Sequence, residues 1–334
     1  MKIADREIGE GHTPYLIAEL SCNHGGKIEN AIRLIKLAKR AGADAIKTQC
    51  YEPHTITMNM RKPDFIVQDG LWKGRTLWDL YADAQTPFSW QKDLYQCAHD
   101  EGITIFSSVF DRSAVDYLET LGCPAYKIAS MEVVDTVLIE HAAETGKPLI
   151  ISTGMASTRE ILDAHEASNG KAAFLHCTSE YPATPEGANL PRMVQLQRLL
   201  PESIVGISDH SKGSTVPIAA TALGTRIIEK HFGLLQGVKS EDDTFSLSAN
   251  DFLRMAKRVR MTWEAMQLRL DTPNPTRQMR RSLYASADIK EGEAFTEENV
   301  KSIRPGYGLP CKMFRVILGK EAKRDFRKGD PLSL

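Results

Sequence analysis

Eight short apolar runs, each followed by polar residues and mostly by a stretch of helical composition, constrain the fold of this sequence more than any other feature. The runs occupy residues 15–18, 45–48, 104–106, 125–128, 149–151, 172–175, 204–207 and 226–229. Eight strand and helix alternations in about 255 residues favour a closed (β/α)8 TIM barrel over an open doubly wound sheet. The open sheet is further disfavoured because no G-x-G-x-x-G motif follows the first run.

The stretches between the runs carry the signals of helices. Residues 28–40 have apolar side chains at helical spacing, and Gly42 is expected to end that helix. Residues 87–101 are predicted to form a helix with Thr86 as its N-cap and Pro87 as its first residue. Further helices are expected at 136–145, 157–169, 217–223 and 250–266.

Polar side chains follow every predicted strand, and in a barrel these strand ends converge on the face that carries active sites. They include Glu19, Lys47, Gln49, Ser107, Ser108, Lys127, Ser130, Glu132, Ser152 and Ser208. Lys47 and Lys127 lie where a buried strand meets the mouth of the barrel, so each charge requires an anionic partner. Single hydroxyl groups such as that of Ser152 have an alternative role, which is to cap the helix that follows.

Two histidines, His210 and His231, end consecutive predicted strands. Parallel strands joined by a right-handed crossover lie side by side, so both imidazoles should emerge from the same edge of the sheet. A lone histidine is more often a structural residue, but this recurrence favours a divalent metal site. Imidazole ligands without thiolates suit Mn²⁺ or Mg²⁺ better than Zn²⁺.

The charge balance gives no reason to expect a polyanionic partner. The 334 residues include 42 Lys and Arg and 43 Asp and Glu, a net charge of -1, which argues against nucleic acid or an anionic membrane. Six cysteines without a C-x-x-C pair, and a beginning without an apolar signal segment, favour a reducing cytoplasm. No apolar run reaches the length of a membrane span.

Two segments interrupt or follow the barrel pattern. Residues 51–85 form a long connection after the second strand, and we interpret 64–81, with Trp72, as a substrate wall; a structural flap is the alternative. The predicted barrel domain spans 1–270 and a Pro-rich linker spans 271–281. Residues 282–334 then read as a small β-rich domain with strands at 282–286, 294–295, 300–303 and 316–318.

Seven motifs, in order and spacing, resemble those of the sialic acid synthase family, and the resemblance covers nearly the whole chain. They are IAELSCNH at 17–24, ADAIKTQ at 43–49, YKIASME at 126–132, ISTGM at 151–155, HCTSEYP at 176–182, ISDHS at 207–211 and EKHF at 229–232. The tail, from RSLYA at 281–285 to KSIRPG at 301–306, resembles the antifreeze-like (SAF) domain of that family.

The resemblance implies a metal-dependent condensation of phosphoenolpyruvate with an aminosugar aldehyde, which gives a nine-carbon 2-keto acid and releases phosphate. It also implies a domain-swapped homodimer. Matching positions assign the metal to His210 and His231, and phosphoenolpyruvate to Lys47, Ser107 or Ser108, Lys127, Ser130, Ser152 and Ser208. Sugar-side or catalytic positions match Glu19, Gln49, Tyr181, Asp242 and Arg304, with Glu132 managing proton transfer at the active centre and Lys127 neutralising charge.

Departures from the sialic acid subgroup resemble the pseudaminic acid branch of the family. Ser179 replaces an asparagine of the subgroup, and SEDDTFSL at 240–247 replaces its G-P-D-H motif. The acceptor implied is 2,4-diacetamido-2,4,6-trideoxy-L-altrose, whose methyl groups suit contacts with Phe245 and Trp72. The alternatives are a synthase of N-acetylneuraminate or legionaminic acid, a metal-dependent aldolase or sugar isomerase, and a catalytically idle sugar-binding or scaffold protein.

Overall fold

The computed structural model describes every residue except 71, 235–237, 239, 268–275 and 334. The chain divides into two compact units, Met1–Gln267 and Leu268–Leu334, which are considered separately. Residues 271–275 of the predicted linker at 271–281 lie outside the described residues.

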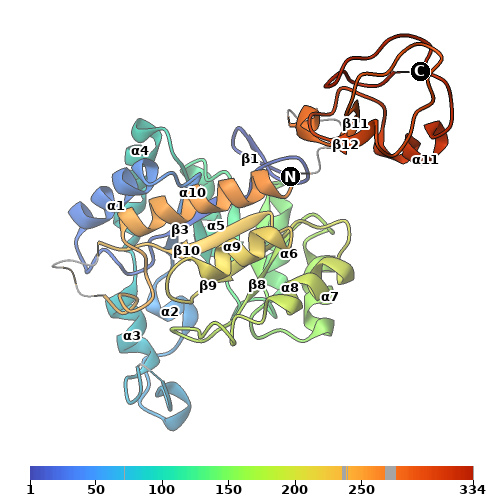
Figure 1. Ribbon diagram of the computed structural model, residues 1–334. Helices are drawn as coiled ribbons and strands as arrows, with labels where there is room; N and C mark the ends of the chain where they lie inside the picture. Colours follow the sequence, from blue (N-terminus) through green and yellow to red (C-terminus); the bar gives the residue numbers. More distant parts are fainter. Residues whose placement is uncertain (71, 235–237, 239, 268–275, 334) are drawn as a thin grey trace. The chain divides into compact units, whose positions relative to one another are not determined.

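The first unit is a closed barrel of eight parallel strands, as the sequence predicts (Figure 1). Its hydrogen-bonded order is β10-β3-β4-β5-β6-β7-β8-β9. The strands are β3 (Tyr15–Glu19), β4 (Ala45–Cys50), β5 (Thr104–Val109), β6 (Tyr126–Ile128), β7 (Leu149–Ser152), β8 (Ala173–Cys177), β9 (Val205–Asp209) and β10 (Ile227–His231). Almost all of their residues are buried, because helices cover the outside of the barrel and side chains fill its interior.

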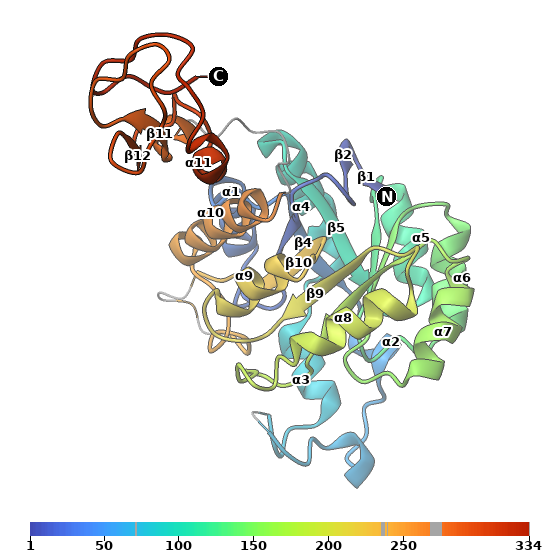
Figure 2. The same cartoon turned by 45° about the vertical axis from the view of Figure 1, so that its right-hand side comes forward.

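Helices surround the strands, and α8 lies against β8 and β9 while α9 lies against β9 (Figure 2). The outer helices are α1 (Ile28–Arg40), α4 (Phe88–Glu101), α5 (Arg112–Thr120), α6 (Thr136–Glu144), α7 (Thr158–Ala167), α8 (Leu190–Leu199), α9 (Thr215–Ala222) and α10 (Ala249–Ala265). In α1 the buried residues Ala31, Leu34, Ile35 and Ala38 form one stripe, and Gly42 follows with a φ of 80°, which glycine adopts without strain.

The start of α4 differs from the prediction. Pro87 occupies the N-cap position, not the first helical position, and no side chain caps this helix. Thr86 is fully buried, and its hydroxyl lies 3.3 Å from Nε2 of His24. The predicted N-cap role of Thr86 is therefore wrong, because its hydroxyl is engaged by a histidine 62 residues away in sequence.

The long connection after β4 contains ordered elements of its own. These are α2 (Pro53–Ile56), a 3₁₀ turn η1 (Pro63–Phe65) and α3 (Leu77–Ala84). Thr76 caps α3 by accepting a hydrogen bond from the backbone N–H of Asp79. An antiparallel bridge between Ile66 and Thr76 closes the turn that carries Trp72. We refer to residues 51–85 as the insertion.

A two-stranded hairpin and the second unit complete the described structure. The hairpin, β1 (Lys2–Ile3) and β2 (Arg6–Glu7), precedes the barrel. In the second unit β11 (Ser282–Ala285) pairs with β12 (Val300–Ile303), and η2 (Arg277–Met279), η3 (Cys311–Met313) and α11 (Phe314–Ile317) accompany them. The strand predicted at 316–318 is wrong, since residues 314–317 form a helical turn that buries Ile317 in the small core.

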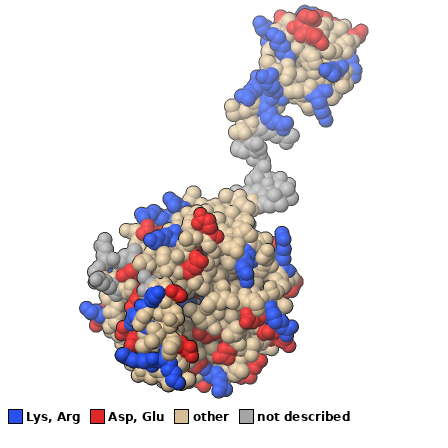
Figure 3. Space-filling view, turned by 90° about the horizontal axis from the view of Figure 1, so that it is seen from below, with Lys and Arg blue, Asp and Glu red and all other residues tan. Residues whose placement is uncertain are grey.

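The surface carries charges of both signs. Figure 3 shows Lys and Arg side chains interspersed with Asp and Glu on the face of the first unit that it presents. Among the described residues, no helix has the length and apolar character that crossing a membrane requires.

Candidate active site

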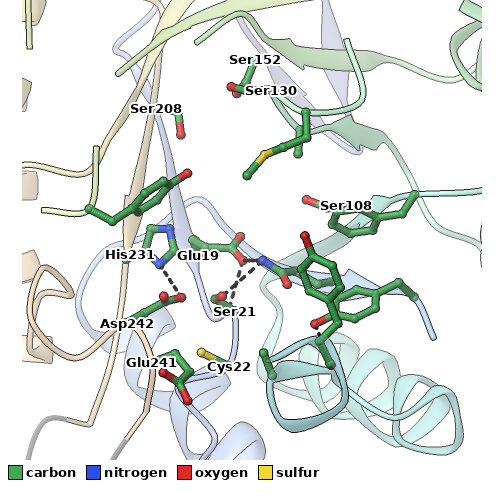
Figure 4. A pocket seen from close by; sticks show the side chains of 18 of the residues that line it. Glu19, Ser21, Cys22, Ser108, Ser130, Ser152, Ser208, His231, Glu241 and Asp242 are labelled. Carbon is green, nitrogen blue, oxygen red and sulfur yellow. Dashed lines mark hydrogen bonds and ion pairs between the residues drawn. The ribbon is translucent and has the colours of Figure 1, made fainter. Parts of the chain in front are cut away.

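A cavity of about 290 Å³ lies at the carboxyl ends of the barrel strands and extends under the insertion. Figure 4 shows Ser130, Ser152 and Ser208 at one end, Glu241 and Asp242 at the other, and Glu19 and His231 between them. Of the residues named from the sequence, those that line the cavity are Glu19, Lys47, Gln49, Trp72, Ser108, Lys127, Ser130, Glu132, Ser152, Tyr181, Ser208, His210, His231 and Asp242. The structure thus brings together residues from across the whole barrel.

The two lysines form a cationic floor with serine hydroxyls beside it. The Nζ of Lys47 donates to Ser108 Oγ at 2.8 Å, and the Nζ of Lys127 donates to Ser152 Oγ at 2.7 Å. Both lysines are almost completely buried. Ser130 and Ser208 line the same part of the cavity. This arrangement of ammonium groups and hydroxyls suits a ligand with phosphate and carboxylate groups.

Glu229 is a buried member of this site that our sequence reasoning did not single out. Its Oε1 lies 3.5 Å from Lys47 Nζ and accepts a hydrogen bond from Ser208 Oγ at 3.2 Å. Burial alone would raise the pKa of Glu229, but the charges of Lys127 and Lys47 lower it to about 2. The period of two residues along β10, which puts Glu229 on the same side as His231, is the signal that could have identified it.

Lys47 makes a second, shorter ion pair with Glu19, at 2.5 Å. The two carboxylates overcome the effect of burial and raise the pKa of Lys47 above its usual value, so Lys47 is charged. In the described part of the chain no carboxylate lies as close to Lys127, and burial lowers the pKa of Lys127. Gln49 completes this side of the cavity by donating to Ser21 Oγ at 3.2 Å.

His210 and His231 lie side by side, with ring centroids 5.2 Å apart. The carbonyl oxygen of Thr178 lies 3.0 Å from Nδ1 of His210, and because a carbonyl only accepts, that nitrogen carries the proton. Oδ2 of Asp242 lies 3.2 Å from Nδ1 of His231. Both contacts involve Nδ1, so Nε2 is the nitrogen of each ring that would bind a metal ion. Metal-binding histidines are usually oriented in this way.

The described part of the chain contains no group of three or more His, Cys, Asp or Glu side chains arranged to hold a metal ion. The pair of imidazoles fits a divalent ion that takes its remaining ligands from water and substrate. His210 and His231 are the residues that would hold it.

Glu132 faces the cavity from the loop after β6. Its Oε2 is buried and has no hydrogen-bond partner among the described residues, and burial raises the pKa of Glu132 to about 7 in spite of the opposing charge of Lys127. A carboxyl group with this pKa exchanges protons readily at neutral pH.

Aromatic rings surround the histidines. The Tyr181 ring lies 4.4 Å from the His210 ring and 6.0 Å from the Trp72 ring, measured between centroids. Phe245 is buried and packs against both histidines, at 6.0 Å from His210 and 4.8 Å from His231. Phe245 is absent from the cavity lining, so it supports the histidine rings from behind and is not placed to contact a sugar as predicted.

Three further predicted residues lie elsewhere. Ser107 points away from the cavity, because neighbouring residues of a strand face opposite sides, and its hydroxyl contacts Thr48 and Tyr95. Ser108 is thus the serine of this pair at the cavity. Ser179 does not line the cavity. Its hydroxyl lies so close to Gly154 that a Cβ on that glycine would collide with it. Arg304 is exposed in the second unit.

Comparison with known proteins agrees with this architecture. Residues 34–269 match the NeuB family and residues 280–334 match the SAF domain. The chain belongs to the NeuB family. It is 45% identical to a pseudaminic acid synthase of Campylobacter jejuni, with 95% of each chain covered, and 40% identical to one of Helicobacter pylori, with 96% of each covered. The crystal structure of an N-acetylneuraminic acid synthetase from Leptospira borgpetersenii matches with a TM-score of 0.72 and 28% identity, over 82% of this chain and 92% of that one.

Membership of the NeuB family accounts for the motifs recognised in the sequence. The matched segment spans the strands that carry Lys47, Lys127, His210 and His231. The predicted resemblance to the sialic acid synthase family, including its C-terminal SAF domain, is therefore confirmed.

Proposed function

We propose that this chain condenses phosphoenolpyruvate with 2,4-diacetamido-2,4,6-trideoxy-L-altrose to form pseudaminic acid and phosphate. The observation that carries the proposal is one cavity with two chemically different ends, in a chain that is 40–45% identical to pseudaminic acid synthases along 95% or more of its length. One end offers buried ammonium and hydroxyl groups, and the other offers apolar and aromatic side chains.

The polar end suits phosphoenolpyruvate. Lys47, Lys127 and the hydroxyls of Ser108, Ser130, Ser152 and Ser208 are the donors for its phosphate and carboxylate oxygens. Glu19 and Glu229 balance the lysine charges in the absence of a ligand. Because most of these groups lie on strands of one closed barrel, they are preorganised and need little rearrangement when the anion binds.

The reaction forms one carbon–carbon bond and breaks the bond between carbon 2 and the phosphate oxygen. Carbon 3 of the enolpyruvate attacks the aldehyde carbon of the open-chain sugar, and the aldehyde oxygen takes a proton to become a hydroxyl. Water adds to carbon 2, and one of its protons goes to Glu132, which returns it to solvent and so balances the proton that the aldehyde oxygen takes up from solvent. The second proton of that water leaves with the phosphate. Loss of phosphate then leaves the 2-keto group, while Lys127 stabilises the charge that develops on the leaving oxygen.

A divalent ion, Mn²⁺ or Mg²⁺, held by His210 and His231 would supply Lewis-acid polarisation of the aldehyde oxygen. Asp242 and the Thr178 carbonyl orient the two rings for this role. Tyr181 and Phe245 limit the movement of the rings by packing against them.

The sugar end of the cavity is lined by apolar side chains of the insertion. These are Ile56, Val67, Trp72, Leu77, Leu80 and Ala84. A 6-deoxy methyl and a second acetamido methyl both lose exposure to water against such a surface, whereas a hydroxyl in the same place would lose hydrogen bonds. The wall therefore supports the diacetamido trideoxy sugar over N-acetylmannosamine.

The test measures phosphate release by the purified full chain with phosphoenolpyruvate, Mn²⁺ and a panel of aminosugars, with each product identified by mass. We expect the diacetamido trideoxy sugar to be preferred over N-acetylmannosamine by about 100-fold or more in kcat/KM. A preference for the acceptor of N-acetylneuraminate or legionaminic acid would move the chain to that branch. Turnover without phosphate release would indicate an aldolase, and no turnover with any sugar would indicate a binding or scaffold protein.

A further inference from the structure

The carboxylate of Glu241 joins two segments that are far apart in sequence. Its Oε2 accepts a hydrogen bond from Trp72 Nε1 at 2.9 Å, and its Oε1 accepts one from Arg75 Nη1 at 2.7 Å. Glu241 belongs to the connection between β10 and α10, and both donors belong to the insertion. One side chain therefore uses both of its oxygens to hold the tip of the insertion.

The donors on the insertion are themselves fixed. Arg75 also pairs with Asp83 at 2.5 Å and donates to the carbonyl of Asp79 at 3.1 Å, so its guanidinium is anchored on α3. The backbone of Arg75 is paired with that of Val67, whose side chain lines the cavity. A shift of Arg75 would consequently move the apolar wall.

The other partner, Glu241, adjoins the residue that orients a histidine. Asp242 follows it directly and lies 3.2 Å from His231 Nδ1. This loop is held by hydrogen bonds from Ser246 Oγ to the Asp242 carbonyl and from Asn23 Nδ2 to Ser246 Oγ, both at 2.8 Å. The position of Glu241 is therefore set by the same loop that positions His231.

We propose that Glu241 is a positioning residue that holds the sugar wall of the insertion in register with the histidine pair. This inference rests on the proposed function and adds to it the positioning of the acceptor sugar. The contact joins the insertion to residues 240–247, the two segments in which this sequence differs from the sialic acid subgroup. An isolated exposed ion pair contributes little, but this carboxylate is two-thirds buried and has two donors of fixed direction. Loss of the contact releases the wall without altering the lysine floor.

The test compares Glu241→Gln with Asp69→Asn in the full chain. Glu241→Gln keeps the size of the side chain and removes the charge shared by Trp72 and Arg75. We expect the KM for the acceptor sugar to rise about tenfold and the KM for phosphoenolpyruvate to stay within about twofold. Asp69→Asn removes another carboxylate of the insertion, which is exposed and pairs with Lys73, and both constants should stay within about twofold.

A second readout separates this inference from the proposed function. Amide hydrogen exchange of α3 in the protein without substrates should be faster in Glu241→Gln than in the wild type, whether or not the sugar has been identified correctly. Unchanged exchange in α3 would overturn the proposal, and so would an equal rise of both KM values.

The double variant Glu241→Gln with Arg75→Gln distinguishes positioning from direct contact with the sugar. If Glu241 acts through Arg75, each single variant and the double variant should raise the sugar KM by similar amounts. If Arg75→Gln leaves the sugar KM unchanged while Glu241→Gln raises it without faster exchange in α3, Glu241 contacts the sugar itself and the positioning role is wrong.

Discussion

At the scale of single residues, Glu132 combines burial with an unpaired oxygen in a cavity that must move protons. If its ionised form accepts the proton of the attacking water, kcat should fall as the pH decreases through about 7. Glu132→Gln should lower kcat by about 100-fold to 10,000-fold and abolish that limb of the pH profile. Glu140→Gln, at an exposed position on α6, is the control and should leave the profile unchanged. An unaltered limb in Glu132→Gln would assign it to another group.

The raised pKa of Glu132 predicts that its burial lowers the stability of the folded protein at high pH. Because the folded state raises the pKa of Glu132 from 4.5 to about 7, the folded protein binds more protons than the unfolded chain between these values, and its stability decreases as the pH rises through this range. Glu132→Gln should therefore increase the free energy of unfolding at pH 8 by up to about 3 kcal/mol and leave it nearly unchanged at pH 4. Urea unfolding at the two pH values measures this difference, and equal effects at both would contradict it.

The histidine pair predicts a requirement for metal. Removal of divalent ions with a chelator should abolish phosphate release, and Mn²⁺ should restore it. His231→Ala should lose bound Mn²⁺ as measured by elemental analysis, whereas His99→Ala, on the exposed surface of α4, should retain it. Full activity of the metal-free protein would show that the two imidazoles serve another purpose.

At the scale of elements, local patterns were sufficient to predict the barrel. Each buried strand is a short apolar run with a polar end, and the helix at 28–40 shows its buried stripe in the spacing of Leu34, Ile35 and Ala38. The period of two residues along a strand also predicts which side chains share a side, and this separates Ser108 from Ser107. These features could be read from the sequence because they depend on near neighbours.

Contacts between distant segments could not be predicted in this way. Three contacts depend on residues that the barrel brings together from distant parts of the sequence. They are the contact of Thr86 with His24, the contacts of Glu229 with Lys47 and Ser208, and the hydrogen bonds of Glu241 to the insertion. The short helix at 314–317 was missed for another reason, since four residues carry too few periods to distinguish a helix from a strand.

Close packing of two strands makes a prediction at the same scale. Gly206 in β9 lies so near β10 that a Cβ would collide with the backbone oxygen of Ile227 and with the side chain of Leu175. Gly206→Ala should destabilise the barrel by about 3 kcal/mol, because neither the backbone nor the core can yield easily. Gly213→Asn, at an open position with a φ of 76° that asparagine tolerates, is the control. Thermal unfolding of both variants checks the difference, and equal melting temperatures would contradict it.

At the scale of the whole molecule, the barrel unit carries the candidate active site, and the role of the smaller second unit needs an explanation. The core of the second unit is small, with Leu283, Val300 and Phe326 among its buried residues, and a domain of this size gains little stability from its own core. Near Arg304 in sequence, Ile303 and Tyr307 are exposed. On the barrel, Met131 and Met155 are exposed in loops that follow β6 and β7. Exposed apolar groups of this kind favour association with another surface.

The family resemblance supplies the expected partner, which is a second copy of the chain. We expect Arg304 to complete the sugar site of the partner subunit, where its guanidinium could donate hydrogen bonds to an acetamido carbonyl. Arg304→Ala should then raise the KM for the sugar about tenfold or more and leave the KM for phosphoenolpyruvate nearly unchanged. Steady-state kinetics with each substrate varied in turn measures the two constants, and Arg324→Ala is a control arginine from the same unit.

Mixing of subunits tests whether Arg304 acts across the expected dimer. If Arg304 acts in trans, a hybrid of Arg304→Ala and Lys127→Ala subunits contains one site with both lesions and one with neither, so activity at sugar concentrations well below KM should rise after subunit exchange. Lys127→Ala protein by itself lacks the lysine beside Ser152 in every site, so its activity before mixing is the baseline for the mixture. If hybrids form and no activity returns, Arg304 acts within its own subunit or outside the site. At sugar concentrations well below KM, where an Arg304→Ala site works at only about a tenth of the wild-type rate, recovery to about half of the wild-type rate per hybrid would require each barrel to be completed by its partner.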